Sequence, residues 1–547
     1  MAHKTEIGKD ILEMLMFSLY PEAETIYREY LQNATDSIRE ACDTGVLDSM
    51  EDGHISIRIN PSQHSVVIQD NGIGISAESA ERTLKDVAKT TKKKKDYLAG
   101  YYGIGRLVGA GYCRRLIFET SAKGESLESK IVFDVDKIRA ILEDEDNDMG
   151  ASEVIDAVTA FSQRPVNEED HFFRVSLNDI LADYPELLDE TAIRDYLKQV
   201  APIDYLAEFK NSLIKPSISE NGEDYLLRYN SMSRVKVSLN DYVDIRKPYG
   251  LRIDGTGDQI YGLRFFTIIS DKRESLAWGW YAITEFSTQI PDRDPNNNSF
   301  VLTRGMRLRI HNIQIGNQNF FDGTEYFKQA RSNKYFNGEI HIIHPRIKPT
   351  TDRSDLAPTA EALEFKEKIR AFFNYEMQDV YQTANKVKKQ LEKFQSATNI
   401  LTTSHSTDPS IYGHSASLTA QDVSKAYEDQ SKASEEIRKQ LDAPRAQKPG
   451  VKAMLNVYQQ KMNQIREEAE ASMLEEPSAL YGSGKNDMPV PKPTATEEME
   501  AMACKYGSEG IGMLKKVFTL IDRHTPTRSK EIVSSIKSAV LNDLKNE

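Results

Sequence analysis

The stretch IYREYLQNATDSI, residues 26–38, has apolar residues at every third or fourth position, which predicts an amphipathic helix. Glu29, Asn33 and Asp36 stand at positions i, i+4 and i+7, so they share one face of that helix. A carboxylate, an amide and a second carboxylate on one face are typical of a solvated surface. They are also groups that a catalytic site uses. Both interpretations stay open on this helix alone.

The next informative stretch is VVIQDNGIGIS, residues 66–76, a predicted strand that ends at Asp70 and enters a turn at Gly72 and Gly74. An aspartate at a strand end can accept a hydrogen bond from the exocyclic amine of a purine. Glycines let a ligand approach the backbone closely. Taken alone, the same residues are more typical of an ordinary Asn-Gly turn, which is common in loops.

A third stretch, GYYGIGRLVGAGY (100–112), places Gly100, Gly103 and Gly105 in front of an apolar helical run. Free backbone N–H groups at a helix start form a nest for phosphate oxygens. The glycine spacing is a poor dinucleotide fingerprint, and the chain has no GxxxxGK[ST] loop. This stretch is therefore a weak signal by itself.

The chain resembles the N-terminal nucleotide-binding domain of the ninety-kilodalton heat-shock chaperones, within the GHKL ATPase superfamily. The resemblance is carried by four stretches in the same order, namely SLYPEAETIYREYLQNATDSI (18–38), QDNGIGIS (69–76), VAKTTKKKK (87–95) and GYYGIGRLVGAG (100–111). It is close over residues 5–120 and weaker up to residue 180. The order of the stretches is far more specific than any one of them.

The resemblance implies a role for each matching polar residue. Glu29 would be the general base that activates water for attack on the γ-phosphate of ATP, and Asn33 would be a ligand of Mg²⁺. Asp70 would take the adenine amine, above a pocket floor shaped by Gly72 and Gly74. The other nucleotide-binding residues that the resemblance implies are Asp36, Lys89, Gly100, Gly103, Ile104 and Gly105. Of these, the glycines would wrap the phosphates, and Asp36 would hold the helix face or touch a bound water.

Residues 76–99 would form the ATP lid, and the lysine run 92–95 lies within it, either as a solvated loop or as a phosphate contact. One departure from the family stands at the strand FFRVSL (172–177). The chaperones usually carry a glycine-threonine pair there, whose threonine helps to bind adenine. This chain has His171, Phe172 and Phe173 in the region, so the resemblance supplies no adenine contact from that side.

A further match is FNGEIHIIHPRIKPTTDRSDL (336–356), which resembles the chaperone middle-domain segment that supplies an arginine to the γ-phosphate. Arg353 is the candidate for that arginine, with Lys348 and Arg346 as the alternatives. An arginine from a second domain would couple hydrolysis to domain closure.

The expected fold class is α+β, with an N-terminal GHKL (Bergerat-type) α/β sandwich, a second α+β domain and a helical C-terminal region. Alternating strands such as HISIRIN (54–60) and SVVIQD (65–70) predict a hairpin in a mixed sheet with helices on one face. Trp278 and Trp280 are expected to be a buried pair on one face of a strand, or else an exposed partner patch. The predicted parts are 1–185 for ATP binding, 186–365 for the second domain, 366–472 for helices, 473–496 for a linker and 497–547 for a dimerisation element.

The 547 residues carry 70 Lys and Arg against 84 Asp and Glu, a net charge of −14, which disfavours a nucleic-acid coat. No apolar run is long enough to span a membrane. The three cysteines have no metal or disulfide spacing, which favours a reducing cytoplasm.

The function expected from the resemblance is an ATP-driven dimeric clamp that acts on a protein client, with ATP and Mg²⁺ as its ligands. The alternatives are a MORC-like, mismatch-repair-like or topoisomerase-like clamp on nucleic acid, in a defence system for instance, and a nucleotide-gated scaffold. A sensor histidine kinase is disfavoured, because the Glu29 helix begins too early to leave room for a phosphoacceptor-helix pair.

Overall fold

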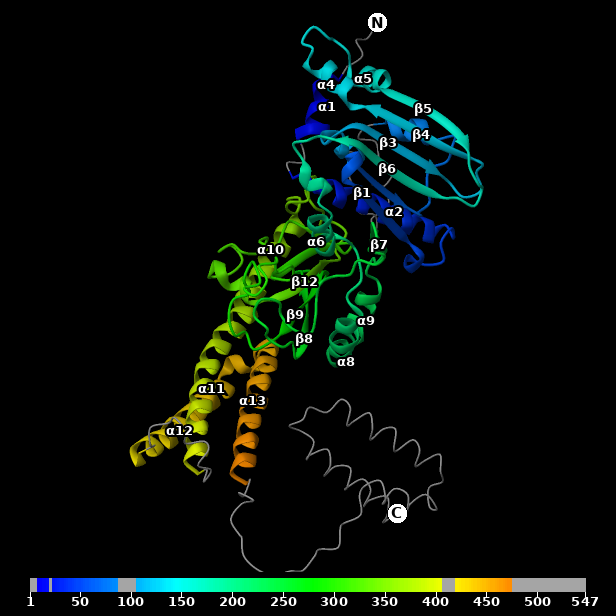
Figure 1. The fold of residues 1–547 in the computed structure, drawn as a ribbon. Coiled ribbons are helices and arrows are strands. Elements are labelled where there is room, and N and C mark those ends of the chain that lie inside the picture. The colour runs from blue at the N-terminus through cyan, green and yellow to red at the C-terminus, as the bar shows by residue number, and fades with distance from the viewer. Residues whose placement is uncertain (1–6, 19–21, 87–104, 406–418, 475–547) are drawn as a thin grey trace, which may run out of the picture. The chain divides into compact units, whose positions relative to one another are not determined.

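The computed structural model describes residues 7–18, 22–86, 105–405 and 419–474, which all belong to one compact unit, Met1–Glu475 (Figure 1). Most of the expected lid (87–99), the expected linker (473–496, apart from 473 and 474) and the expected dimerisation element (497–547) lie outside these residues. None of the described helices combines the length and the apolar content needed to cross a membrane.

The first sheet has seven strands in the order β5-β4-β3-β6-β2-β1-β7. Its strands are β1 (His54–Asn60), β2 (Ser65–Asp70), β3 (Cys113–Ser121), β4 (Leu127–Asp134), β5 (Thr159–Pro165), β6 (Phe172–Ile180) and β7 (Lys236–Leu239). All neighbouring pairs are antiparallel except β1 and β7, which are parallel. The predicted hairpin is confirmed as β1–β2, and the mixed sheet is confirmed as well.

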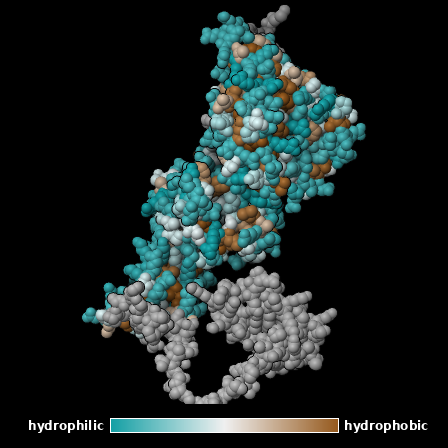
Figure 2. All heavy atoms as spheres, viewed as in Figure 1, coloured by the Kyte–Doolittle hydropathy of each residue, from teal (hydrophilic) through white to brown (hydrophobic). Residues whose placement is uncertain are grey.

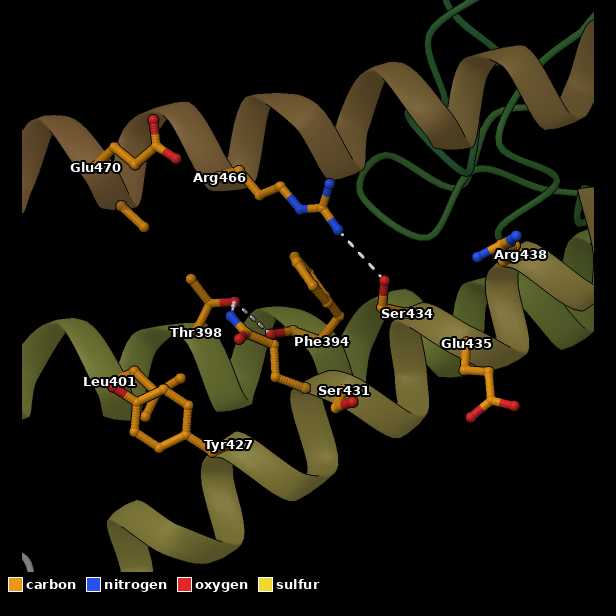
Figure 3. A pocket seen from close by; sticks show the side chains of 12 residues that line it. Phe394, Thr398, Leu401, Tyr427, Ser431, Ser434, Glu435, Arg438, Arg466 and Glu470 are labelled. Atoms are coloured by element: carbon orange, nitrogen blue, oxygen red, sulfur yellow. Dashed lines mark hydrogen bonds between the residues drawn. The ribbon is translucent and has the colours of Figure 1, made fainter.

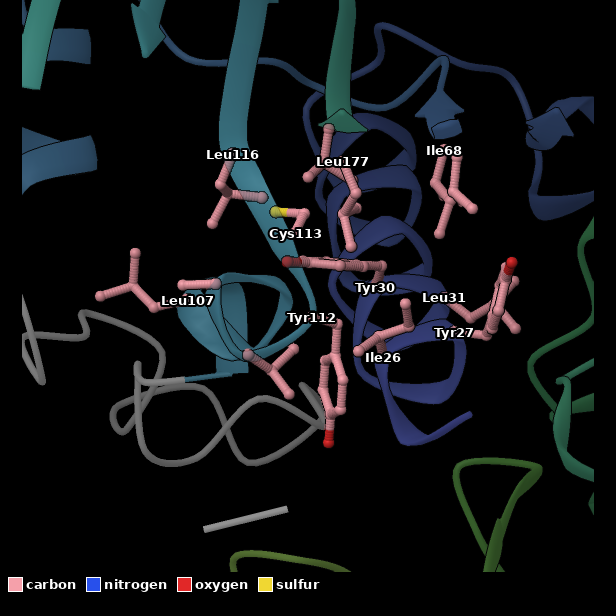
Figure 4. Packing of buried hydrophobic residues seen from close by; sticks show 14 of the residues in the cluster. Ile26, Tyr27, Tyr30, Leu31, Ile68, Leu107, Tyr112, Cys113, Leu116 and Leu177 are labelled. Atoms are coloured by element: carbon pink, nitrogen blue, oxygen red, sulfur yellow. The ribbon is translucent and has the colours of Figure 1, made fainter. Parts of the chain in front are cut away.

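Helix α2 (Thr25–Asp43) covers the buried face of this sheet (Figures 1 and 4). The side chains of β1 and β2 alternate between the core and the opposite face, which is the pattern of a sheet with one covered side. Figure 4 shows Tyr30 extending from α2 toward Leu107 and Cys113, beneath the strand residues Leu116 and Leu177. Because Tyr30 points into this core, the neighbouring Glu29 lies on a different face of α2.

Strand β7 begins at Lys236, well beyond the boundary expected at residue 185, yet it joins the first sheet. Val237 pairs with Ile55, and the core of the first sheet also takes in Leu197 and Ile203. Parallel pairing needs a crossover between the two strands, so the local sequence alone does not reveal the partner. The N-terminal core therefore reaches well past residue 185.

The other helices that precede the second sheet are short. They are α1 (Asp10–Glu13), α3 (Ala80–Lys85), α4 (Val135–Glu143), α5 (Ala151–Val158), α6 (Glu190–Val200), α7 (Ala207–Phe209), α8 (Lys215–Asn221) and α9 (Glu223–Asn230), of which α7 to α9 lead toward the second sheet. A 3-10 segment, η5 (Gly105–Gly111), stands where an apolar helical run was expected.

The second sheet has five strands in the order β11-β10-β12-β9-β8. They are β8 (Gly262–Ile269), β9 (Ser275–Ile283), β10 (Gly305–Ile310), β11 (Ile313–Ile315) and β12 (Asn337–Ile342). Trp278 and Trp280 are each 1% exposed and pack on one face of β9, whereas Tyr281 belongs to the core on the other face. The buried pair is confirmed, so the two tryptophans form no partner patch.

A buried carboxylate joins the second sheet to the chain that precedes it. Glu339 on β12 accepts hydrogen bonds from Lys247 Nζ at 2.7 Å and from Arg309 Nε at 2.6 Å, and Tyr205 OH also donates to it. All four residues are at most 1% exposed. Paired charges with full hydrogen bonding are tolerated in a core, while loss of one partner is costly. The cluster therefore fixes the position of the second sheet against residues 205–247.

Three long helical stretches complete the described chain, as the sequence predicts. They are α10 (Ala360–Phe372) continuing through a π-helical turn into α11 (Gln378–His405), then α12 (Ala420–Leu441) and α13 (Pro449–Leu474). Near their far ends α13 separates from α11 and α12 and leaves a groove of about 680 Å³ (Figure 3). Arg466 of α13 donates to Ser434 Oγ across this groove at 3.3 Å. The view in Figure 2 shows a mainly hydrophilic surface with scattered apolar residues.

Candidate active site

Glu29 lies on α2 and is almost completely buried, at 5% exposure, although the sequence alone would also allow a solvated position. The neighbouring Tyr30 fixes this part of the helix, because its hydroxyl donates to the Arg106 carbonyl oxygen at 2.9 Å and accepts from Gly109 N at 3.0 Å. A buried carboxylate is stable only when it is paired. The interpretation of this face as a solvated surface is therefore wrong for Glu29.

The partner of Glu29 is Arg353, from the loop after β12. Arg353 Nε lies 2.8 Å from Glu29 Oε1, and the two side chains are 5% and 6% exposed. The residues are 324 positions apart in the chain. The structure thus brings together the two residues that the sequence proposed for catalysis.

The loop that carries Arg353 is strained and firmly held. Arg353 has φ of 58°, in the left-handed region that a residue with a side chain rarely adopts. Its carbonyl oxygen accepts from Gly316 N at 2.8 Å, and its N–H donates to the Thr350 carbonyl oxygen at 3.1 Å. Another arginine, Arg28 of α2, also holds this loop. Its Nη2 donates to the Asp352 carbonyl oxygen at 2.7 Å. Strain that surrounding contacts maintain is a feature of functional sites.

The turn after β2 holds Asp70 in a fixed orientation. Asp70 is 4% exposed, and its Oδ1 accepts from Gly72 N at 2.8 Å and from Ser37 Oγ at 3.1 Å. Gly74 has φ of 68°, and a Cβ there would lie 1.9 Å from the Ser121 carbonyl oxygen, so only glycine fits. Ser37 comes from α2, which ties this turn to the helix that carries Glu29.

Of the three glycines expected to wrap the phosphates, Gly105 is the one that falls among the described residues. It lies directly against Glu29. A Cβ at this position would be 2.5 Å from Glu29 Oε2. The backbone at the start of η5 therefore approaches the carboxylate because residue 105 has no side chain. Lys89, Gly100, Gly103 and Ile104 lie outside the described residues, so their expected roles stay predictions.

Asn33 and Asp36 differ in their surroundings. Asn33 follows Glu29 by one turn and is partly exposed, with no hydrogen bond of its amide to another described side chain. Asp36 is 2% exposed and lies near His311, in the turn between β10 and β11. Burial lowers the pKa of His311 to about 4, while the Asp36 carboxylate opposes that shift and Arg39 adds to it. Asp36 thus stands where α2 meets the second sheet.

The amide oxygen of Asn33 would suit a magnesium ion that is held mainly by phosphate oxygens. No group of three or more His, Cys, Asp or Glu side chains with metal-binding geometry occurs among residues 7–18, 22–86, 105–405 and 419–474. Mg²⁺ in nucleotide sites keeps several waters and takes one or two protein oxygens, so a single amide oxygen such as that of Asn33 suffices.

Several residues of the site were missed by the sequence reasoning. His171 Nδ1 lies 2.8 Å from the Gly72 carbonyl oxygen, so this departure from the family supports the glycine turn. Thr120 Oγ1 accepts from Ile75 N at 2.9 Å and donates to the Phe172 carbonyl oxygen at 2.9 Å. Ser37 and Arg28 gave no signal either, because serine and arginine on a helix are ordinarily surface residues.

Comparison with known proteins matches part of the first sheet region to a known family. A family model described as "Histidine kinase-, DNA gyrase B-, and HSP90-like ATPase" matches residues 22–163. The chain carries a GHKL ATPase domain. The matched range includes α2, the Asp70 turn and η5.

The curated proteins to which this chain is similar include chaperone proteins HtpG. The HtpG of Legionella pneumophila (strain Lens) is 34% identical over 121 residues, which is 19% of each chain. The HtpG of Shouchella clausii is 25% identical over 269 residues, which is 46% of this chain and 39% of the relative. That of Buchnera aphidicola subsp. Acyrthosiphon pisum is 27% identical over 155 residues, or 23% of this chain and 25% of the relative. The chain is thus similar to HtpG chaperones and spans only about a fifth to two fifths of their length in these matches.

Proposed function

We propose that this protein is an ATP-hydrolysing molecular clamp of the HtpG type, which closes and reopens on a protein client. The observation that carries the proposal is the contact between Glu29 and Arg353. A base on the GHKL domain and a cation on the second sheet region meet at one point. Hydrolysis at that point would depend on the two regions being docked together.

In this proposal each residue has a separate task. Glu29 takes the proton of the attacking water, and Arg353 offsets the negative charge that gathers on the phosphoryl oxygens. The two sit 2.8 Å apart, so a γ-phosphate beside Glu29 would be within reach of the guanidinium. Asp70 receives the adenine amine, and the backbone at Gly105 faces the phosphates.

Asn33 would hold Mg²⁺ together with phosphate oxygens. A magnesium ion bound there would offset negative charge on the phosphates. The chain's own part is to place Asn33 one turn from Glu29 on a helix that Tyr30 and Ser37 keep in place.

Steady-state ATP hydrolysis tests this proposal directly. We expect magnesium-dependent turnover that a denatured client protein stimulates and that duplex DNA does not. Stimulation by DNA alone, falling steeply with added salt, would instead support a clamp on nucleic acid. Tight ATP binding without any turnover, with or without client, would contradict the enzyme and support a nucleotide-gated scaffold.

We also propose that the clamp is a cytoplasmic homodimer joined through residues 497–547. The support is the resemblance to HtpG and the apolar spacing of GMLKKVFTLI (512–521) in the sequence. We expect the full chain to have the mass of a dimer in light scattering, and a chain ending at residue 495 to have the mass of a monomer. A truncated chain that still has the mass of a dimer would place the dimer interface outside residues 497–547.

A further inference from the structure

A tight turn joins β10 to β11 where the second sheet meets the N-terminal region. Ile310 pairs with Ile313, so His311 and Asn312 form a two-residue turn between the strands. Both residues have a positive φ, 51° and 65°, which is typical of a hairpin turn of this length. Asn312 is only 3% exposed. A buried amide is stable only when its polar groups have hydrogen-bond partners.

The side-chain amide of Asn312 has partners on both sides. Its Nδ2 donates to the Ser233 carbonyl oxygen at 2.7 Å and to the Ile203 carbonyl oxygen at 3.3 Å, and its Oδ1 accepts from Lys247 Nζ at 2.7 Å. Ile203 belongs to the core of the first sheet. Ser233 is tied to α2, because its Oγ accepts a hydrogen bond from Arg39. One amide at the edge of the second sheet thus holds two backbone positions of the N-terminal region.

The other end of the same hairpin holds the loop of Arg353. Strand β11 is only three residues long, and Gly316 follows it directly. The Gly316 N–H donates to the Arg353 carbonyl oxygen at 2.8 Å. A Cβ on Gly316 would lie 3.1 Å from the Ser354 carbonyl oxygen, so the loop packs closely on the strand end. Because β10 pairs with both β11 and β12, the hairpin is a rigid link between Asn312 and this loop.

The turn also lies close to the ion pair of the candidate site. Burial lowers the pKa of His311 to about 4, and the Asp36 carboxylate of α2 opposes that shift. The positive charge of Arg353 contributes to the lowering, so the turn is within electrostatic reach of this arginine. His311 is neutral at pH 7, since its pKa lies well below that value. The turn therefore adds no charge beside Arg353.

We propose that Asn312 is a positioning residue for hydrolysis. Its amide fixes the β10–β11 hairpin on the N-terminal region, and the hairpin sets Arg353 against Glu29. This role rests on the proposed function, because it concerns the reaction assigned to those two residues. The two partners are 324 positions apart, so their alignment depends on how the two regions dock. A displacement of about 1 Å in a positioned group can lower a rate roughly 100-fold.

The decisive variant is Asn312→Gly, which removes the amide but keeps a residue that adopts positive φ without strain. We expect turnover at saturating ATP to fall at least about tenfold, while KM for ATP changes less than about twofold. Asn312→Asp should show the same split, because it keeps the shape and sets a carboxylate oxygen against the two carbonyl oxygens. In an Arg353→Ala background, Asn312→Gly should cause little further loss, since both act through the same guanidinium.

Asn240→Gly is the matched control. Asn240 also has a positive φ, 48°, and its Nδ2 donates to the Ile59 carbonyl oxygen at 3.2 Å and to Glu190 Oε2 at 2.7 Å. The variant therefore removes a similar structural amide within the first sheet region, without a contact to the β10–β11 hairpin. Both variants should lower the melting temperature. Only Asn312→Gly should lose turnover.

Hydrogen exchange followed by mass spectrometry gives a readout that needs no ATP hydrolysis. We expect faster exchange at residues 313–316 and 350–356 in Asn312→Gly, and native exchange there in Asn240→Gly. If the native chain hydrolyses ATP and Asn312→Gly loses no more turnover than Asn240→Gly, the positioning role is overturned while the proposed function stands. If the native chain does not hydrolyse ATP, the proposed function fails. Exchange at residues 350–356 then decides whether Asn312 holds the Arg353 loop, and unchanged exchange overturns that role too.

Discussion

Replacement of Glu29 by glutamine is expected to lower ATP turnover by about 10²- to 10⁴-fold, the usual contribution of a positioned general base. The amide keeps the size of the side chain and its place beside Gly105, but it cannot accept the proton of water. ATP affinity should change little, because Glu29 makes no contact with the Asp70 turn that we assign to adenine. Single-turnover hydrolysis and equilibrium titration with ATP measure the two quantities separately.

Asp43→Asn is the matched control for this variant, because it removes one negative charge at an exposed position of the same helix. We expect it to keep native turnover. Arg353→Ala should also lose most of its turnover, since it removes the positive charge that faces Glu29. The double variant with Glu29→Gln should then be little worse than Glu29→Gln alone, because residues that act as one unit are not additive. Full turnover in Glu29→Gln would exclude this residue as the base.

Replacement of Asp70 by asparagine is expected to weaken ATP binding by at least about 100-fold, since it sets a donor against the adenine amine in a buried site. The amide oxygen of asparagine can still accept from Gly72 N and Ser37 Oγ, so the turn should keep its shape. Equilibrium titration with ATP and with GTP measures the effect. The preference for ATP over GTP should fall as well, because a guanine presents an oxygen where adenine has its amine.

Asp48→Asn, at an exposed position after α2, is the control for Asp70→Asn and should bind ATP as the native chain does. A merely structural Asp70 would give a different pattern from the one that we expect. Its loss would lower the melting temperature and weaken ATP and GTP equally. An unchanged ratio of the two affinities would therefore remove the adenine role.

Local sequence patterns predicted most elements of the fold correctly. The apolar spacing of residues 26–38 predicted α2, and the alternation in 54–60 and 65–70 predicted the β1–β2 hairpin. Such patterns reflect contacts between near neighbours in the chain. The parallel pairing of β7 with β1 could not be predicted in this way, because no local signal names a strand's distant partner.

In the candidate site, too, the sequence predicted individual residues but not the contacts between residues that are distant in the chain. Glu29, Asp70 and Gly105 were identified from their motifs, and Arg353 was identified from the resemblance of its segment. The hydrogen bond from Ser37 to Asp70 and the support of Gly72 by His171 were not identified. These contacts join side chains whose residue types are common on any surface. Only their positions in the folded chain distinguish them.

The sequence by itself, through its resemblance to a known family, predicted a GHKL-type domain, which a family model matches over residues 22–163. It also named the candidate residues for the chemistry of that domain. Only the tertiary structure decided that Arg353 pairs with Glu29 across 324 residues, and that β7 joins the first sheet beside β1. The reason is physical. Burial and long-range pairing depend on how α2 and the loops of the second sheet region come together in space, and the residue types along the chain do not carry that information.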